Sequence, residues 1–331
     1  MPSIVYHVFQ KTASFFAQIK LRNLKYCYCY RTSGSFFLTK QIRYDIILEI
    51  RRCGAVTFLC RRFDFFSKEF FMSIIDSFDP QDRPIIGVED VYEKRAERLD
   101  ACIINFSRKI TDALLEDGLI EELAPDTIKS VSCDYPVYLY KGTNIGMVQT
   151  TVGAPVTAVL LQEIGHIFSC RRFVLFGSCG GLDRTIPPGK LIVPTHAYRD
   201  EGTSYHYAPP ADYIEIKNHP AVCGVLDALG IEYVIGRTWT TDAFYRETEK
   251  RCNARKSEGC IAVEMELSAC QAVADWCGVE LYSFLYRADN LDSFKWEEGV
   301  LSSLPADERL KHFFVALEIA KEASQKDECG N

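Results

Sequence analysis

Short apolar runs alternate with segments of helical spacing between about residues 101 and 323. The four apolar residues Phe173–Phe176 are typical of a buried strand. Apolar residues spaced like Ile110 and Leu114 predict a helix that covers such a strand. We expect strands at residues 101–106, 135–140, 144–150, 173–176, 189–197, 233–240, 261–263 and 279–286, and helices at 109–120, 155–168, 221–229, 267–276 and 307–323. This order predicts an α/β protein with one helix-covered sheet.

The helix expected at 155–168 can be oriented from its sequence. Pro155 is well placed to open it, because proline is favoured in the first turn. Its spacing predicts that Val159, Leu160 and Ile164 face the core.

A glycine-rich stretch, G-S-C-G-G from Gly177 to Gly181, follows the apolar run Phe173–Phe176. It predicts a turn whose backbone N–H groups, together with the hydroxyl of Ser178, can hold phosphate or another oxyanion. A tight connection without a ligand is the commoner explanation for one such loop. The stretch matches neither the dinucleotide-binding nor the P-loop pattern.

Several predicted strands end in polar residues. In α/β sheets ligands bind beyond the carboxyl ends of strands, so these side chains are expected to meet at one pocket. A carboxylate there can bind the vicinal hydroxyls of a sugar, and a second, kept protonated by a neutral pocket, can act as a general acid. Taken singly, each acidic residue is more often a helix cap or a solvated edge. The candidates are Ser178, Thr241, Asp242, Glu264, Glu266 and Asp289, and we expect at most one of the two glutamates to face the pocket.

Two aromatic segments lie near these candidates. Residues 198–210, Y-R-D-E-G-T-S-Y-H-Y-A-P-P, are rich in hydrogen-bonding groups, as binding loops are. Phe244 and Tyr245 are core aromatics by default, but beside a pocket they can stack on a flat ring.

Charge divides the chain of 331 residues unevenly. Residues 1–71 carry 12 Lys and Arg against 4 Asp and Glu, whereas the rest carries 26 against 41. The first segment has no apolar run long enough to span a membrane, and it lacks the order of a secretory signal. A basic surface segment is one explanation; our preferred prediction is that residues 1–71 lie outside the fold, upstream of a start at Met72. Residues 72–100 are then a polar lead, and residues 101–331 the main domain.

The 14 cysteines form no C-x-x-C pair, and the chain has no H-E-x-x-H sequence, so we predict no metal site. Most cysteines lie in apolar runs, as reduced core residues do. A reducing cytoplasm is the expected location.

Five short motifs carry a resemblance to a known family. They are G-S-C-G-G-L from Gly177, D-E-G-T-S-Y-H-Y-A-P from Asp200, T-D-A-F-Y from Thr241, V-E-M-E from Val263 and A-D-N from Ala288. In this order, over residues 101–323, the chain resembles the nucleoside phosphorylases of the purine nucleoside and uridine phosphorylase group.

The resemblance implies a three-layer α/β/α fold around a twisted mixed sheet, and a homodimer or a ring of dimers. It implies that inorganic phosphate, as co-substrate and without a further cofactor, cleaves a nucleoside into free base and ribose 1-phosphate. Partners are then small molecules, with neither nucleic acid nor membrane. By motif, Ser178 with Gly177 would bind phosphate, Glu266 the ribose hydroxyls beside Glu264, Met265 would pack on the sugar, Phe244 would stack on the base, and Asp289 would protonate the leaving purine.

The chain departs from the family pattern at two expected cations. Leu175 stands where many members have an arginine, and residues 105–109 replace the usual arginine loop, with Arg108 as a possible substitute. A hydrolytic nucleosidase on the same fold is therefore an alternative. A nucleoside-sensing module without turnover is a third, although a binder needs no acid such as Asp289.

Overall fold

The computed structural model describes residues 73–129, 133–293, 295–301 and 303–325, together with five short strands among the first 71 residues. The chain divides into two compact units, Met1–Phe71 and Met72–Asn331. In the first unit, β2 (Cys29–Thr32) and β3 (Ser35–Leu38) form an antiparallel pair, and β4 (Leu48–Arg52) pairs with β1 (Ala17–Gln18) and β5 (Ala55–Leu59). That residues 1–71 lie outside the fold of the working protein stays a prediction.

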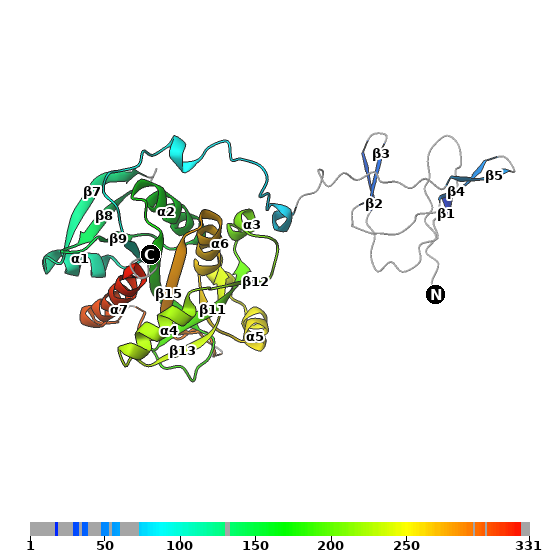
Figure 1. Cartoon of the computed structure of the whole chain (residues 1–331). Coiled ribbons are helices and arrows are strands. Elements are labelled where there is room, and N and C mark those ends of the chain that lie inside the picture. Colours follow the sequence, from blue (N-terminus) through cyan, green and yellow to red (C-terminus); the bar gives the residue numbers. More distant parts are fainter. Residues whose placement is uncertain are drawn as a thin grey trace. The chain divides into compact units, whose positions relative to one another are not determined.

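The second unit is built on one mixed sheet of ten strands, ordered β12-β11-β13-β14-β10-β6-β9-β8-β7, with β15 beside both β10 and β11. Because β15 pairs with both, the strands β10, β15, β11, β13 and β14 close a circuit. Figure 1 shows β15 beside β11. The strands are β6 (Ala101–Asn105), β7 (Ile120–Lys129), β8 (Asp134–Tyr140), β9 (Ile145–Gln149), β10 (Arg172–Gly181), β11 (Leu191–Asp200), β12 (Tyr213–Glu215), β13 (Tyr233–Thr241), β14 (Cys260–Glu264) and β15 (Glu280–Asn290).

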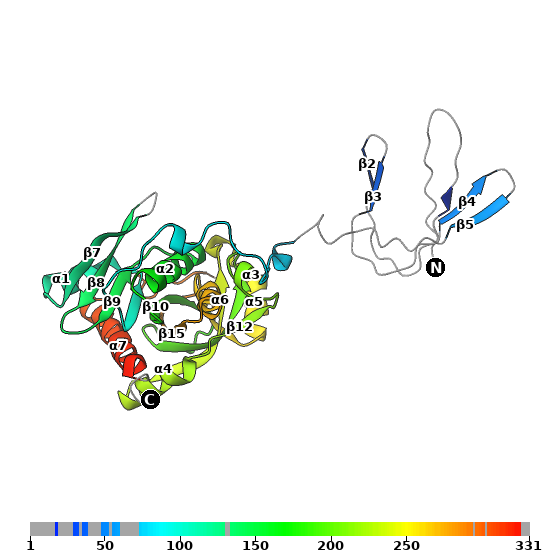
Figure 2. The same cartoon turned by 45° about the horizontal axis from the view of Figure 1, so that its top comes forward.

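Helices cover both faces of this sheet, so the architecture is the expected three-layer α/β/α fold (Figure 2). Alternate residues of β10 enter two separate cores: Phe173 and Leu175 join one, Val174 and Phe176 the other. The first core takes α2 (Ala154–Ile167) and α6 (Leu267–Cys277), and the second takes α1 (Arg108–Glu116), α4 (His219–Ala228) and α7 (Ala306–Gln325). The short α3 (Ser204–Tyr207) and α5 (Glu249–Ser257) lie near the ends of the sheet.

Most predicted elements are confirmed, but β7 and β12 are not among them. The sequence of residues 120–129 is I-E-E-L-A-P-D-T-I-K. Its proline and acidic residues are unfavourable in strands, so the pattern did not predict one. In the structure β7 is paired only with β8, with two register irregularities, and an edge strand tolerates proline. Val159 was expected in the core, yet it is 45% exposed, whereas Leu160 and Ile164 are buried as predicted.

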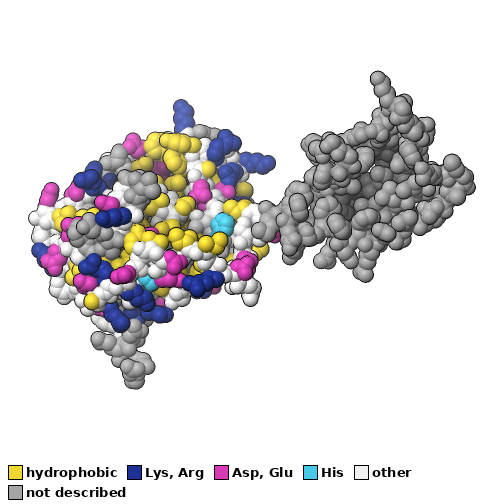
Figure 3. Space-filling model, turned by 90° about the horizontal axis from the view of Figure 1, so that it is seen from above, with side chains coloured by type: hydrophobic (Ala, Val, Ile, Leu, Met, Phe, Trp, Pro, Cys, Tyr) yellow, Lys and Arg dark blue, Asp and Glu magenta, His cyan; other side chains and the backbone are white. Residues whose placement is uncertain are grey.

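The surface of the second unit carries charges of both signs. On the face seen in Figure 3, Lys and Arg side chains are interspersed with Asp and Glu, and apolar side chains form a strip between them. Among the described residues, no helix combines the length and apolar character needed to cross a membrane.

Candidate active site

Three neighbouring strands bring the candidate residues together, as the sequence predicts. Gly180 on β10 is the register partner of Asp289 on β15 and of Val263 on β14. Asp289 therefore lies on one side of β10, and the segment Glu264–Glu266, which follows Val263, lies on the other side. Thr240 pairs with Glu264, so the end of β13 joins the same edge of the sheet.

The glycine-rich stretch is strand rather than turn. Strand β10 continues through Gly181, and none of Gly177, Gly180 and Gly181 has a positive φ, so the prediction of a turn was wrong. These glycines serve close packing instead: a Cβ on Gly177 would press on the Phe106 ring, and one on Gly181 would meet the Arg287 side chain. Ser178 is the exposed residue of this stretch.

Ser178 is linked to a buried cation through Tyr286, its register partner on β15. Burial raises the pKa of Tyr286, while the Arg309 charge and hydrogen bonds with Ser178 and Arg309 oppose that rise. Arg309 is buried on α7 and also donates to the carbonyls of Leu304 and Leu301. A positive charge thus lies one side chain away from the predicted phosphate residue.

The other candidate cations are engaged elsewhere. The position of the family's arginine holds no cation, because Leu175 stands there and is buried in the core. Arg108 is on the surface and pairs with Asp112 at 3.5 Å, and Arg172 is buried and pairs with Glu280 at 3.5 Å.

Glu264 is a supporting residue by its geometry. It is 5% exposed; Oε1 accepts from the hydroxyls of Thr238 (3.3 Å) and Thr240, and Oε2 from the backbone N–H groups of Glu266 (2.8 Å) and Leu267 (2.7 Å). These four donors join β13, β14 and the start of α6. Its predicted contact with substrate gains no support from this arrangement.

Glu266 differs from Glu264 in its partners. It is 7% exposed, and its carboxylate accepts the backbone N–H of Gly153 at 2.6 Å and that of Met265 at 3.3 Å. Burial, and then the charge of Glu264, raise the pKa of Glu266 to about 8. Each oxygen of this carboxylate accepts one N–H, so the buried group has room for further donors, such as sugar hydroxyls. Met265 is half-buried beside it.

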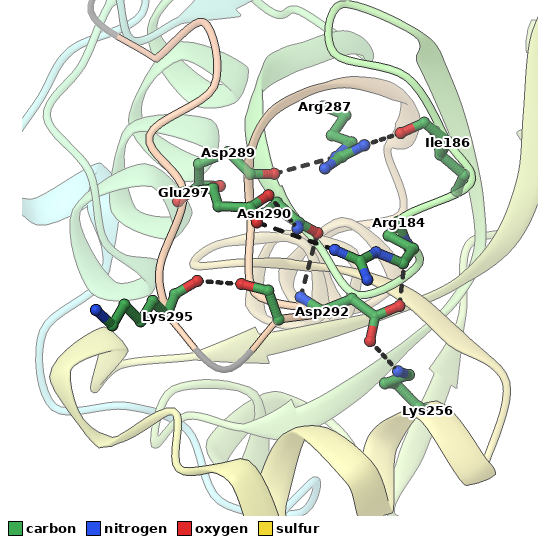
Figure 4. Close-up of polar contacts among 10 residues, drawn as sticks. Arg184, Ile186, Lys256, Arg287, Asp289, Asn290, Asp292, Lys295 and Glu297 are labelled. Atoms are coloured by element: carbon green, nitrogen blue, oxygen red, sulfur yellow. Dashed lines mark hydrogen bonds and ion pairs between the residues drawn. The ribbon is translucent and has the colours of Figure 1, made fainter.

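Asp289 is held by one side chain that the sequence did not single out. The indole N–H of Trp296 donates to Oδ2 of Asp289 at 2.6 Å. Burial raises the pKa of Asp289, and the bond from Trp296 and the charge of Arg287 act against that rise. Arg287 is itself buried and donates to the carbonyls of Ile186 and Asp289 (Figure 4).

The aromatic candidates are exposed at the end of β13. Phe244 and Tyr245 begin a short 3-10 helix, Phe244–Arg246, with their rings 4.1 Å apart and 47% and 90% exposed. A ring with so little burial is free to accept a base. Close by, burial and the charge of Asp289 raise the pKa of Glu247 to about 7, and Arg251 opposes this.

Residues 198–210 are occupied by hydrogen bonds among themselves and with neighbouring elements, which differs from the expected binding loop. Arg199 donates to Ser204 (2.8 Å) and to the carbonyl of Pro209 (2.6 Å), and Glu201 accepts from Thr203 and Ser204. Their hydrogen-bonding groups build α3 and fasten it to α6 through Ser268.

Sequence reasoning missed Trp296, Glu247 and Gly153. Trp296 is in a loop without periodicity, seven residues after Asp289, and gave no signal. Gly153 offered one, because it stands two residues before Pro155 at the start of the predicted helix; in the structure it is the N-cap of α2, with a φ of 121°. Among the described residues no group of three or more His, Cys, Asp or Glu side chains is placed to hold a metal ion.

Gly299 closes the loop that carries Trp296, and its replacement is a test of that loop. It has a φ of 56°, and a Cβ there would overlap the carbonyl of Ala288. We expect Gly299→Ala to lower the free energy of unfolding by about 2 to 4 kcal/mol, measured by urea denaturation. Gly142→Ala is the control, since it has a φ of 78° but open space around it, and should cost about 1 kcal/mol. Equal losses would contradict the overlap.

The comparisons with known proteins identify the family of the chain. The model of the Phosphorylase superfamily matches residues 115–317. Purine nucleoside phosphorylase DeoD-type of Bacillus cytotoxicus is 27% identical over 188 residues, which are 56% of this chain and 77% of that protein. The same-named protein of Bacillus cereus is 26% identical over the same shares.

Two solved structures share the fold. AMP nucleosidase from Bacteroides thetaiotaomicron has a TM-score of 0.53 at 20% identity, over 68% of this chain and 90% of that one. Purine nucleoside phosphorylase from Toxoplasma gondii has a TM-score of 0.58 at 18% identity, over 70% and 93%. With the family model covering more than half of its length, the chain belongs to the Phosphorylase superfamily.

Proposed function

We propose that the chain is a nucleoside phosphorylase that cleaves the N-glycosidic bond of a purine nucleoside with inorganic phosphate, releasing the base and ribose 1-phosphate. The observation that carries the proposal is the pair of carboxyl groups at one sheet edge: Glu266 beside Gly153, and Asp289 beside Gly180. Two acidic residues with separate environments suit two separate roles. The names of the Bacillus relatives support purine as the base.

Each residue has a defined task in this reaction. Glu266 binds the ribose hydroxyls and fixes the sugar, and Phe244 stacks on the base. Asp289, with a pKa raised by burial, gives a proton to the leaving base. Phosphate, on the side of Ser178, attacks the anomeric carbon as positive charge develops on the sugar.

A nucleosidase is the second candidate, and a specific observation favours it. Leu175 places an apolar side chain where a cation would neutralise phosphate, and Arg108 is paired with Asp112 at the surface. Charge-assisted hydrogen bonds to phosphate are strong in a water-poor site, so their absence favours water over phosphate as the nucleophile. Arg309, linked through Tyr286, is the cation that supports phosphate instead.

The decisive measurement is the identity of the sugar product. Purified protein is incubated with inosine, adenosine and uridine, with and without inorganic phosphate. We expect ribose 1-phosphate from a purine nucleoside, and only when phosphate is present. Free ribose, formed at a rate independent of phosphate, would make the protein a nucleosidase.

We also propose that the working protein is a homo-oligomer in the cytoplasm. Val152, next to the Gly153 that contacts Glu266, and Val159, in the second turn of α2, are 63% and 45% exposed. A second copy that covers them would also shield the site from water. Light scattering tests this, and a monomer at working concentration would contradict it.

The nine described cysteines form no disulfide with one another, which suits a reducing compartment.

A further inference from the structure

The loop between β15 and α7 is fastened at several points close to Asp289. The backbones of Asn290 and Glu297 exchange hydrogen bonds of 2.9 and 3.2 Å, and the Asn290 side chain donates to Glu297 at 2.6 Å. Asp292 accepts from the backbone of Arg184 at 3.1 Å and pairs with Lys256 on α5 (Figure 4). The residue next to Glu297 is Trp296, so these bonds hold the backbone of Trp296 close to the end of β15.

The two oxygens of Asp289 have different surroundings. Oδ2 accepts the indole N–H of Trp296 at 2.6 Å. Oδ1 faces Gly180, where a Cβ would lie 3.1 Å from it. The missing side chain at Gly180 thus leaves room for the carboxyl group on one side, and the indole holds it on the other.

We propose that Trp296 is a positioning residue for Asp289: its indole N–H donates to one carboxyl oxygen and fixes the carboxyl group at the site edge. This inference rests on the proposed function, because only a reaction with a leaving base gives Asp289 a group to protonate. Trp296 is 58% exposed, so its ring is at the surface and not a core residue.

Other groups act on Asp289 from the elements around it. Arg287 lies on the same strand and lowers the pKa of Asp289. Glu247, after β13, and the buried thiol of Cys179, on β10, interact with the charge of Asp289. Trp296→Phe leaves all three in place and removes only the N–H donor.

The direction of the expected pKa shift follows because the indole N–H of Trp296 binds the ionised carboxylate of Asp289 more strongly than the neutral acid. Without the indole N–H the carboxylate loses a stabilising bond, so the pKa of Asp289 rises. A general acid works while protonated, so its activity is lost as pH rises through that pKa. Trp296→Phe should therefore move the basic limb of kcat/KM upward by about one pH unit.

The first measurement needs no substrate. Tryptophan fluorescence of the full chain is followed against pH, and we expect a titrating component that is absent from both Trp296→Phe and Asp289→Asn. Trp276→Phe, at the end of α6, is the matched control and should keep it. A component that persists in Asp289→Asn, or its absence from the wild type, would overturn the contact.

The second measurement separates this inference from the proposed function. If nucleoside cleavage is found, an unchanged basic limb in Trp296→Phe, with folding verified by circular dichroism, overturns the positioning role. If no nucleoside is cleaved, the proposed function fails and the role for a leaving base fails with it, whereas the fluorescence titration still decides whether Trp296 and Asp289 are in contact.

Discussion

Asp289→Asn should lower kcat for nucleoside cleavage by about 10²- to 10⁴-fold, the usual contribution of a positioned acid. Asparagine keeps the shape of the side chain and an oxygen that accepts the N–H of Trp296, so the fold and the loop should stay intact. It has no proton to give to the base. The affinity for the nucleoside should change by less than about threefold, since the ribose is bound by Glu266. Single-turnover rates and calorimetric binding give the two quantities.

Asp275→Asn is the matched control for this substitution. Asp275 is near the end of α6, where it pairs with Lys217 at 2.7 Å, and its replacement should leave kcat unchanged. A variant at position 289 with wild-type kcat would remove Asp289 from the chemistry. A wild-type protein that binds a nucleoside without turnover, with equal affinity in Asp289→Asn, would instead support a sensing module.

Periodicity was sufficient for the interior of the fold. Strands such as β6 and β10 have apolar residues on both faces, because both faces are covered by helices, and such runs are visible in sequence. The edge strand β7 was missed because one proline and several charges are tolerated where pairing is one-sided. The glycines of β10 were predicted to form a turn because the sequence does not distinguish a glycine that permits a turn from one that permits close packing.

The candidate site was predictable where it follows strand ends, and not where it depends on loops. Ser178, Glu264 and Asp289 all lie at the ends of β10, β14 and β15, which topology brings together. Trp296 contacts Asp289 only because the Asn290–Glu297 bonds turn the loop back. The contrast between Glu264 and Glu266 also depends on geometry, since the hydrogen-bond donors of each come from distant parts of the chain.

That contrast gives the second large prediction, for Glu266→Gln. Folding raises the pKa of Glu266 from the ordinary range to about 8, so its contribution to stability is full below pH 4.5 and is lost as pH rises toward 8. Glutamine resembles the protonated form and stays neutral. The variant should therefore unfold with a free energy higher than wild type by roughly 3 to 5 kcal/mol at pH 9, and by little at pH 5. Urea denaturation at both pH values measures this.

Binding should change in the opposite direction. Ribose hydroxyls donate to the ionised carboxylate, so nucleoside binding releases a proton and strengthens as pH rises toward 8. In an Asp289→Asn background, which prevents turnover, the affinity should rise about 50-fold between pH 6 and pH 8, and Glu266→Gln should abolish that rise. Titration calorimetry gives the affinity and, from two buffers, the proton released.

Glu264→Gln is the control that tells a site carboxylate from a structural one. Burial also raises the pKa of Glu264, but its two carboxylate oxygens accept four hydrogen bonds and an amide NH₂ accepts none, so the variant should be less stable than wild type at pH 7 by about 2 kcal/mol or more. Stabilisation by Glu266→Gln at high pH, together with destabilisation by Glu264→Gln, is the expected pair. If both variants destabilise the protein equally at pH 9, Glu266 is not strained by its burial, and its role as the acceptor for ribose hydroxyls loses its physical basis.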